Sequence, residues 1–171
     1  MRGELDAASE IKSSVAYRLK LEDLKSRFQH SIRVIPAEAL QRFNCYAHAF
    51  GICESPRYDA LVTQTQNSTV MNSDFVKALL ARAELMEVPD HEVQVNDIVL
   101  YFNGEDLKHA GRVSRIAGGF TVHSKWGGNE VHEHKLWEIP GEYGDRVRFF
   151  RPLEETALLD TLEAAYQSGV R

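Results

Sequence analysis

The sequence lacks any long apolar segment. No run of apolar residues approaches the ~20 needed to cross a bilayer. The first six residues, Met1 to Asp6, include two acids and no apolar block, which is unlike a secretory signal. We therefore expect no membrane as partner and a cytoplasmic location, unless a secretion system that needs no such signal exports the protein.

Neither basic nor acidic residues are concentrated in any one segment of the sequence. The chain has 20 basic and 25 acidic residues, a formal net charge of −5, and no long runs of either kind. Proteins that bind nucleic acids normally carry a basic face or stripe. The composition therefore argues against DNA or RNA as a partner.

Cysteine is scarce, with Cys45 and Cys53 alone in 171 residues. If both lie on one helix, helical rise puts their Cα atoms about 12 Å apart. A disulfide requires less than about 7 Å. At least one thiol is then expected to be free for another reason.

The spacing of apolar residues predicts helices first, then a meander of strands, then one closing helix. Apolar positions Leu5, Ile11, Val15, Leu19 and Phe28 indicate one amphipathic helix over 4–29. The other expected helices are 37–43, 44–52, 74–86 and 152–167, the expected strands are 97–102, 109–117, 119–126, 130–136 and 146–150, and 54–69 is expected to be a long loop. In the last helix Leu153, Ala157, Leu158, Leu162 and Ala165 are expected to face inward.

This order predicts the α+β class in a single domain, residues 1–171. We divide it into a helical N-terminal extension (1–40), a core (41–151) and a C-terminal helix (152–171). The expected arrangement places the helix that carries Cys45 against an antiparallel sheet.

Cys45 is the first candidate for chemistry, because it stands where a short apolar helix is expected to begin. Free N–H groups and the partial positive charge of a helix N-terminus lower a thiol pKa and can hold an oxyanion. A cysteine among apolar neighbours is more commonly buried packing. His109, at the start of an expected strand, changes that balance, since a thiol nucleophile needs a base within hydrogen-bond reach.

Three segments in this order resemble the NlpC-type branch of the papain-like cysteine peptidases. They are Asn44-Cys45-Tyr46-Ala47-His48-Ala49-Phe50-Gly51, Asn96-Asp97-Ile98-Val99-Leu100-Tyr101-Phe102 and His109-Ala110-Gly111-Arg112-Val113. The resemblance implies a papain-like fold, Cys45 as nucleophile and His109 as general base. The family usually has a small residue and glycine after the cysteine, and glycine before the strand Asp. Here Tyr46-Ala47 and Asn96 stand in those places.

The resemblance also implies a third polar residue on the following strand that orients the histidine. His123 matches that position best, and a slip of one residue would substitute Ser124. Alternation puts Thr121, His123 and Lys125 on one face and Val122, Ser124 and Trp126 on the other. The Ser124-Lys125-Trp126-Gly127 motif indicates a distinct subfamily.

Several neighbours are weaker candidates. Asn44 and Tyr46 are candidates for contacts with the substrate or the oxyanion, and Trp126 for the substrate rim, although packing is the commoner role of aromatic residues. His48 shares a helix face with Cys45 and competes as a base. His132 and His134 project to one side of a strand as zinc ligands do, but a solvated strand face is the preferred interpretation. We expect no metal and no cofactor.

The predicted activity is that of a cysteine hydrolase which transfers an acyl group from a peptide or isopeptide amide, such as a peptidoglycan stem peptide. Two alternatives remain open. One is a non-catalytic binding domain on the same fold, with Cys45 as packing, and the other is a glutamine deamidase that uses the same residues. The sequence names no protein partner or inhibitor.

Overall fold

The computed structural model describes residues 1–35, 43–127 and 130–168. The helices are α1 Arg2–Ser9, α2 Ser14–Phe28, α3 Cys45–Ala49, α4 Pro56–Thr65, α5 Ser73–Ala81 and α6 Glu155–Gln167, with short 3-10 turns η1 Asp90–Glu92 and η2 Gly141–Tyr143. The strands are β1 Arg33–Ile35, β2 Glu87–Val88, β3 Ile98–Asn103, β4 Asp106–Arg115, β5 Thr121–Lys125, β6 Val131–Lys135 and β7 Arg146–Phe150. The predicted α+β class is confirmed. None of the described helices is both long and apolar enough to cross a bilayer.

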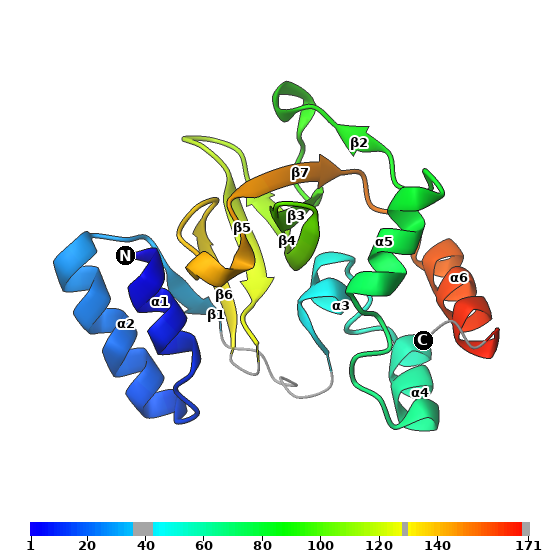
Figure 1. Cartoon of the computed structure of the whole chain (residues 1–171), viewed down its shortest axis with the longest axis horizontal. Helices are drawn as coiled ribbons and strands as arrows, with labels where there is room; N and C mark the ends of the chain where they lie inside the picture. The colour runs from blue at the N-terminus through cyan, green and yellow to red at the C-terminus, as the bar shows by residue number, and fades with distance from the viewer. Residues whose placement is uncertain (36–42, 128–129, 169–171) are drawn as a thin grey trace.

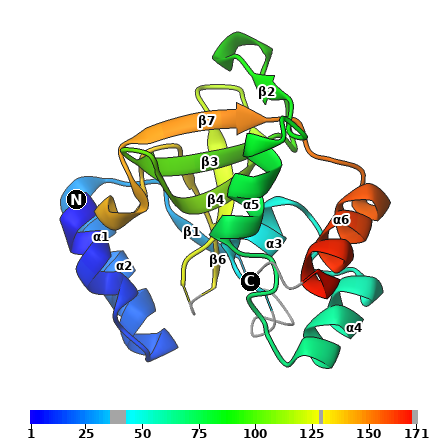
Figure 2. The ribbon, with the colours of Figure 1, turned by 45° about the vertical axis from the view of Figure 1, so that its right-hand side comes forward.

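One antiparallel sheet in the order β1-β6-β5-β4-β3-β7-β2 organises the molecule. The helices α1 and α2 lie on one side of it, and α3 to α6 lie on the other (Figures 1 and 2). Successive side chains of β3 point to opposite faces of the sheet. Ile98 and Leu100 pack with α3 to α6, whereas Val99 and Tyr101 pack with α1 and α2. The sheet therefore separates two apolar cores.

The strand predictions from 97 to 150 are confirmed in number and order, with ends shifted by a few residues. The strands β1 and β2 were not predicted. They have three and two residues, too few for a period-two pattern to stand out, and they form the two edges of the sheet.

The prediction of one helix over 4–29 was wrong. The segment forms α1 and α2, and the side chain of Ser13 caps α2 by accepting a hydrogen bond from the backbone N–H of Ala16. Val15 and Leu19, two of the apolar positions on which that helix was predicted, are each 67% exposed. The buried side chains of α2 are instead Tyr17, Leu21 and Leu24.

The loop expected at 54–69 is largely the helix α4. Ser55 at the N-cap and Pro56 in the first turn are the ordinary start signal of a helix, and the polar composition of the segment obscured it. The predicted helix 74–86 begins one residue earlier, where the Asn72 side chain accepts from the backbone N–H of Phe75 at 2.9 Å. In α6, Leu159 is buried in place of Ala157, which is exposed. The helix predicted at 37–43 lies, apart from Phe43, outside the described residues.

The hairpin β3–β4 is the centre of the sheet. β4 pairs with β3 from Asp106 to Arg112, with a bulge at Lys108, because Phe102 pairs with Leu107 and Tyr101 with His109. The pairing with β5 covers only Arg112 to Arg115 of β4. Among the described residues, no strand pairs with the part of β4 before Arg112 on that side.

Gly144 follows η2 and holds that turn against β3. It has φ +117°, and a Cβ atom there would overlap the carbonyl group of Phe102. The backbone N–H of the next residue, Asp145, donates to the same Phe102 carbonyl at 2.9 Å. The close approach of the two backbones therefore requires glycine.

We predict that Gly144→Ala lowers the free energy of unfolding by more than about 3 kcal/mol, since strain from positive φ adds to a backbone overlap. Gly104→Ala is the matched control, because Gly104 also has positive φ (+58°) but nothing lies within 4 Å of the added Cβ. That variant is expected to lose only about 1 kcal/mol. Urea denaturation measures both values, and equal losses would contradict the close approach.

Candidate functional site

Asn44 anchors the start of the helix that carries Cys45. Its Oδ1 accepts from the backbone N–H groups of Tyr46 (3.0 Å) and Ala47 (3.1 Å). Its Nδ2 donates to the Met71 carbonyl at 2.6 Å. The Asn44 side chain is thus committed to capping α3 and tying it to the segment before α5.

The Cys45 side chain lies against β4 at Ala110. Cys45 is the first residue of α3, is partly exposed and has a free thiol. Burial raises the pKa of this thiol to about 11, and the N–H groups of Ala110, Cys45 and Tyr46 and the charge of Lys125 act in the opposite direction. The helix terminus does favour the thiolate, as the sequence predicts, but desolvation outweighs it.

His109 approaches the same part of β4 from the other side of the sheet. It pairs with Tyr101, which faces α1 and α2, whereas Ala110 packs with α3. The His109 ring is 1% exposed, and its Nε2 is buried without a hydrogen-bond partner. Burial lowers its pKa well below 6.5, and the charges of His134, His48 and His132 lower it further, so the imidazole is neutral.

Tyr143 contacts His109 and is affected by the charge of Cys45. Its ring stacks on His109 with centroids 4.0 Å apart and planes 15° from parallel. Burial raises the pKa of Tyr143, and a negative charge on Cys45 raises it further, which places the sulfur within electrostatic range of the phenol. Among the described residues no hydrogen bond joins Cys45 to His109. The shifts in their pKa values leave the thiol and the imidazole both neutral.

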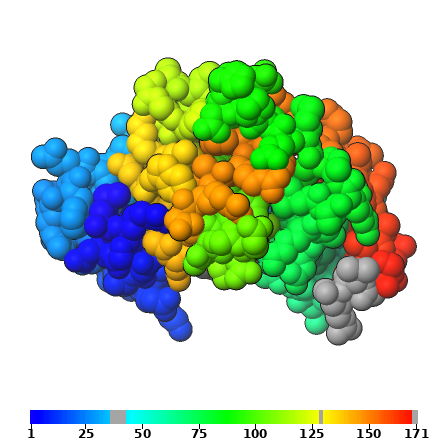
Figure 3. Space-filling model, turned by 45° about the horizontal axis from the view of Figure 1, so that its top comes forward, coloured from blue at the N-terminus to red at the C-terminus, as the bar shows by residue number. Residues whose placement is uncertain are grey.

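The N-terminal helix α1 holds Tyr143 in place. Arg2 donates to the carbonyl groups of Ile139, Pro140 and Gly144 around η2. The Asp6 carboxylate accepts from the backbone N–H of Glu142 at 3.0 Å. Figure 3 shows the dark blue segment of α1 directly against the orange segment that includes η2. This support for His109 could not be predicted from the sequence, since no local pattern links residues 2 and 143.

His123 does not lie beside His109. It pairs with Arg112 across the strands, on the face that α3 covers. Its Nε2 and the Glu133 carboxylate are 3.3 Å apart. Ser124 is on the face of His109, as the alternation predicts, but its hydroxyl is bonded to His134 and Trp126. In this arrangement stacking on Tyr143, rather than either predicted residue, orients the His109 ring.

A buried polar network occupies the face covered by α1 and α2. The Trp126 Nε1–H donates to the Ser124 hydroxyl (2.8 Å), and that hydroxyl contacts the His134 Nε2 at 2.8 Å. The His134 Nδ1 lies 2.8 Å from the Lys135 carbonyl, so Nδ1 carries the proton and Nε2 accepts. His132 Nε2 is bonded to the Tyr17 hydroxyl at 2.8 Å. Trp126 therefore belongs to the core, not to a substrate rim.

The expectation that His132 and His134 lie on a solvated strand face was wrong, since both are fully buried. Trp126 stacks on His132 with centroids 4.3 Å apart, and Tyr17 from α2 closes the other side. The short helical extension, which the strand pattern alone does not reveal, covers this face. Within residues 1–35, 43–127 and 130–168 no group of three or more His, Cys, Asp or Glu side chains is arranged to hold a metal ion.

The remaining candidates lie on the α3 side. Tyr46 is buried in the core, with its hydroxyl toward Ser73, so packing is its role. His48 stacks on Phe43 and its buried Nε2 has no hydrogen-bond partner. Burial, with the charges of His123, Arg112 and Lys125, lowers the pKa of His48 to about 4. Cys53 is free and partly exposed.

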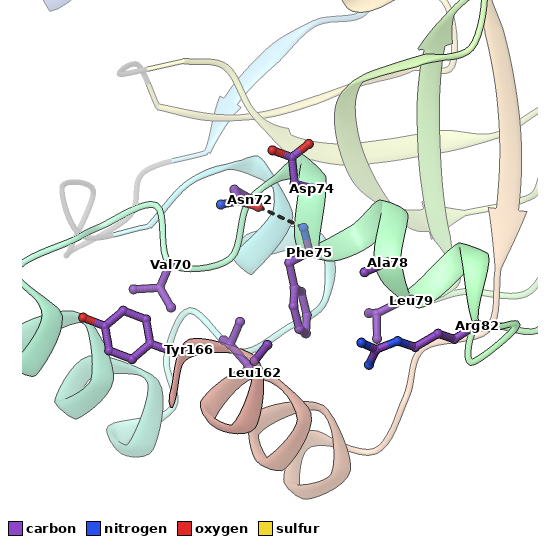
Figure 4. Close-up of a pocket in the computed structure, with 10 residues that line it drawn as sticks. Val70, Asn72, Asp74, Phe75, Ala78, Leu79, Arg82, Leu162 and Tyr166 are labelled. Carbon is purple, nitrogen blue, oxygen red and sulfur yellow. Dashed lines mark hydrogen bonds between the residues drawn. The ribbon is translucent and has the colours of Figure 1, made fainter. Parts of the chain in front are cut away.

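A separate hollow lies between α5 and α6 (Figure 4). Its walls are mainly the apolar side chains of Val70, Phe75, Leu79 and Leu162, with the partly exposed Tyr166 at one end. No cysteine or histidine lines it. This hollow therefore has no nucleophile or base of its own.

The buried histidines predict acid sensitivity. Burial lowers the pKa of His132 to about 3 and that of His134 to about 4, against 6.5 for an exposed histidine. Between pH 6.5 and about 4, only the unfolded chain takes up protons on these two histidines. The free energy of unfolding therefore falls as the pH drops through this window, and above pH 6.5 the two histidines do not change it. Each residue contributes a slope of about 1.4 kcal/mol per pH unit in this window.

We expect His134→Gln to make the plot of unfolding free energy against pH shallower by about that slope, measured by urea denaturation. His91→Gln, at a surface position with the side chain 80% exposed, should leave the slope unchanged. An identical slope in the wild type and His134→Gln would contradict the assignment of His134 as a buried neutral group.

Comparison with known proteins identifies the family of the chain. No curated protein and no solved structure matches the chain. A family model described as a domain of unknown function, DUF7689, matches residues 34–151, the segment from β1 through β7. The match leaves α1, α2 and α6 outside and includes Cys45, His109 and Tyr143. The chain therefore belongs to the DUF7689 family.

Proposed function

We propose that the protein is a cysteine hydrolase of papain-like type that cleaves amides by acyl transfer at Cys45. The observation that carries the proposal is that Cys45 lies against β4 at Ala110, the residue next to His109. The Ala110 N–H stabilises a charge on the Cys45 sulfur, and the adjacent residue, His109, has a buried Nε2 with no partner. A buried unpartnered nitrogen is costly, and a role as proton acceptor explains its retention.

The chemical step follows from the two neutral groups. The Cys45 sulfur bonds to the carbonyl carbon of the substrate while its proton passes to His109 Nε2. The oxyanion that forms is held by backbone N–H groups, of which those of Cys45 and Ala110 lie nearest the sulfur. The C–N bond then breaks, and the amine leaves with the proton from His109. Water hydrolyses the thioester and restores the thiol.

Two backbone features support the papain-like assignment. Asn96 stands where the family has glycine and adopts φ +78°, a conformation that asparagine tolerates better than most residues. A Cβ atom on Gly111 would overlap Val122, which explains glycine in the His-Ala-Gly motif. Asn96 and Gly111 thus each suit the backbone at the positions where the resemblance places family glycines.

The substrate class that the resemblance implies is a peptide or isopeptide amide, with a peptidoglycan stem peptide as the usual case. Deamidation of a glutamine side chain would use the same atoms, with ammonia as the leaving group. A second candidate function is a non-catalytic binding domain. The raised thiol pKa favours it, since an inert buried cysteine has the same property.

Acylation by p-nitrophenyl acetate separates these functions without knowledge of the natural substrate. In a Cys53→Ser background we expect one acetyl group on Cys45, found by mass spectrometry, and release of p-nitrophenol. His109→Gln should slow the acylation on the order of 100-fold, because the base is lost. Cys45→Ala should abolish it.

His48→Gln is the matched control. This histidine lies three residues after Cys45 on α3 but is not the proposed base. Its acylation rate is expected to stay within about threefold of the background rate, well short of the loss that removal of a general base causes. An unacylated Cys45, or equal rates in His109→Gln and the parent, would leave the binding domain as the better account.

A further inference from the structure

Four nitrogen-bearing side chains gather on the sheet face that α3 covers. Arg112 lies on β4, His123 and Lys125 lie on β5, and His48 reaches them from α3. Arg112 and His123 are direct partners across the strands. The charges of Arg112, His123 and Lys125 all act on His48, which shows that the four groups are close together. We call these four residues the nitrogen-donor patch.

Arg112 and His48 have buried donors that the described residues do not use. The Arg112 Nε and the His48 Nε2 are buried without a hydrogen-bond partner. No carboxylate among residues 1–35, 43–127 and 130–168 forms an ion pair with Arg112. A buried guanidinium nitrogen without an acceptor is uncommon, because desolvation of the cation is then not compensated.

The patch contains little acidic charge to neutralise it. Glu133 is 3.3 Å from His123 and is engaged there. The Arg112 guanidinium itself packs over Gly51, where a Cβ atom would come within 2.9 Å of Nη1. Glycine just after α3 therefore leaves space for the guanidinium beside the helix. This packing orients Arg112 along α3, and it does not satisfy Nε.

The patch lies next to the proposed nucleophile. The Cys45 sulfur is at Ala110, and Arg112 is two residues further along the same strand and on the same face, a separation of about 6.6 Å along β4. His48 is three residues along α3 from Cys45, about 4.5 Å by helical rise. Cys45, His48, Arg112 and His123 are each partly exposed.

We propose that Arg112 and His48 bind a carboxylate of the substrate that lies about 6–7 Å from the carbonyl carbon attacked by Cys45. Two N–H donors match the two oxygens of a carboxylate, and a charged acceptor strengthens both bonds. The substrate class is a short acyl or peptide chain with a terminal or side-chain carboxylate at that spacing. This inference rests on the proposed function for the role of Cys45.

A pair of esters tests the spacing and the charge together. Mono-p-nitrophenyl adipate and p-nitrophenyl hexanoate have acyl chains of the same length, and only the adipate ends in a carboxylate, about 6 Å from the attacked carbon when extended. In the Cys53→Ser background we expect the adipate ester to acylate Cys45 at least about tenfold faster than the hexanoate ester. The expected advantage, measured as the ratio of the adipate rate to the hexanoate rate in the same variant, disappears in Arg112→Gln.

Failure of this inference is distinguishable from failure of the proposed function. Acylation by hexanoate with no advantage for adipate would overturn the carboxylate site and leave the hydrolase intact. Arg112→Lys keeps the charge without the planar fork and should retain part of the advantage, which also guards against misfolding of Arg112→Gln. Calorimetric titration of the non-acylated Cys45→Ala variant with monomethyl adipate provides a second readout. Saturable binding that weakens at least about tenfold in Arg112→Gln supports the site, and no binding overturns it.

Discussion

The incomplete pairing between β4 and β5 is the constraint on which the site depends. β4 is bonded to β3 over its first half but meets β5 only from Arg112 onward. This leaves the stretch around His109 and Ala110 open on one side, and α3 places the Cys45 sulfur there. Complete pairing of β4 with β5 would occupy the edge of β4 at Ala110 and separate the thiol from the strand that carries the histidine.

Desolvation then sets the charge state of the groups at this opening. It raises the thiol pKa and lowers the imidazole pKa, so both groups are neutral at rest. In the proposed mechanism the neutral histidine acts as the base, and the thiolate forms only as the carbonyl is attacked. The His109 ring cannot rotate freely, because Tyr143 stacks on it and α1 holds the turn that carries Tyr143. The extension outside the family match thus supports a residue within it.

Much of this could be predicted from residues that act locally. The apolar run 97–102 predicted β3, and the short apolar segment that begins at residue 44 predicted the helix that carries Cys45. The alternation of His123 and Ser124 between faces was also predictable. Contacts between segments that are distant in the sequence could not be predicted, and these contacts determine the surroundings of the buried histidines. Tyr143 against His109, Tyr17 against His132 and the burial of His134 all depend on how α1, α2 and η2 cover the sheet. For the same reason Val15 and Leu19 were assigned to the wrong face of their helix.

The rate of iodoacetamide labelling of Cys45 between about pH 6 and 9 tests the central claim most directly, with Cys53 in the same protein as internal reference. If neutral His109 takes the proton during attack, the Cys45 rate is nearly constant over this range. The Cys53 rate should rise about tenfold per pH unit, because only its thiolate reacts. In His109→Ala the Cys45 rate should acquire the same slope as Cys53. A tenfold rise per pH unit at Cys45 in the wild type, unchanged by His109→Ala, would contradict a working pair of Cys45 and His109.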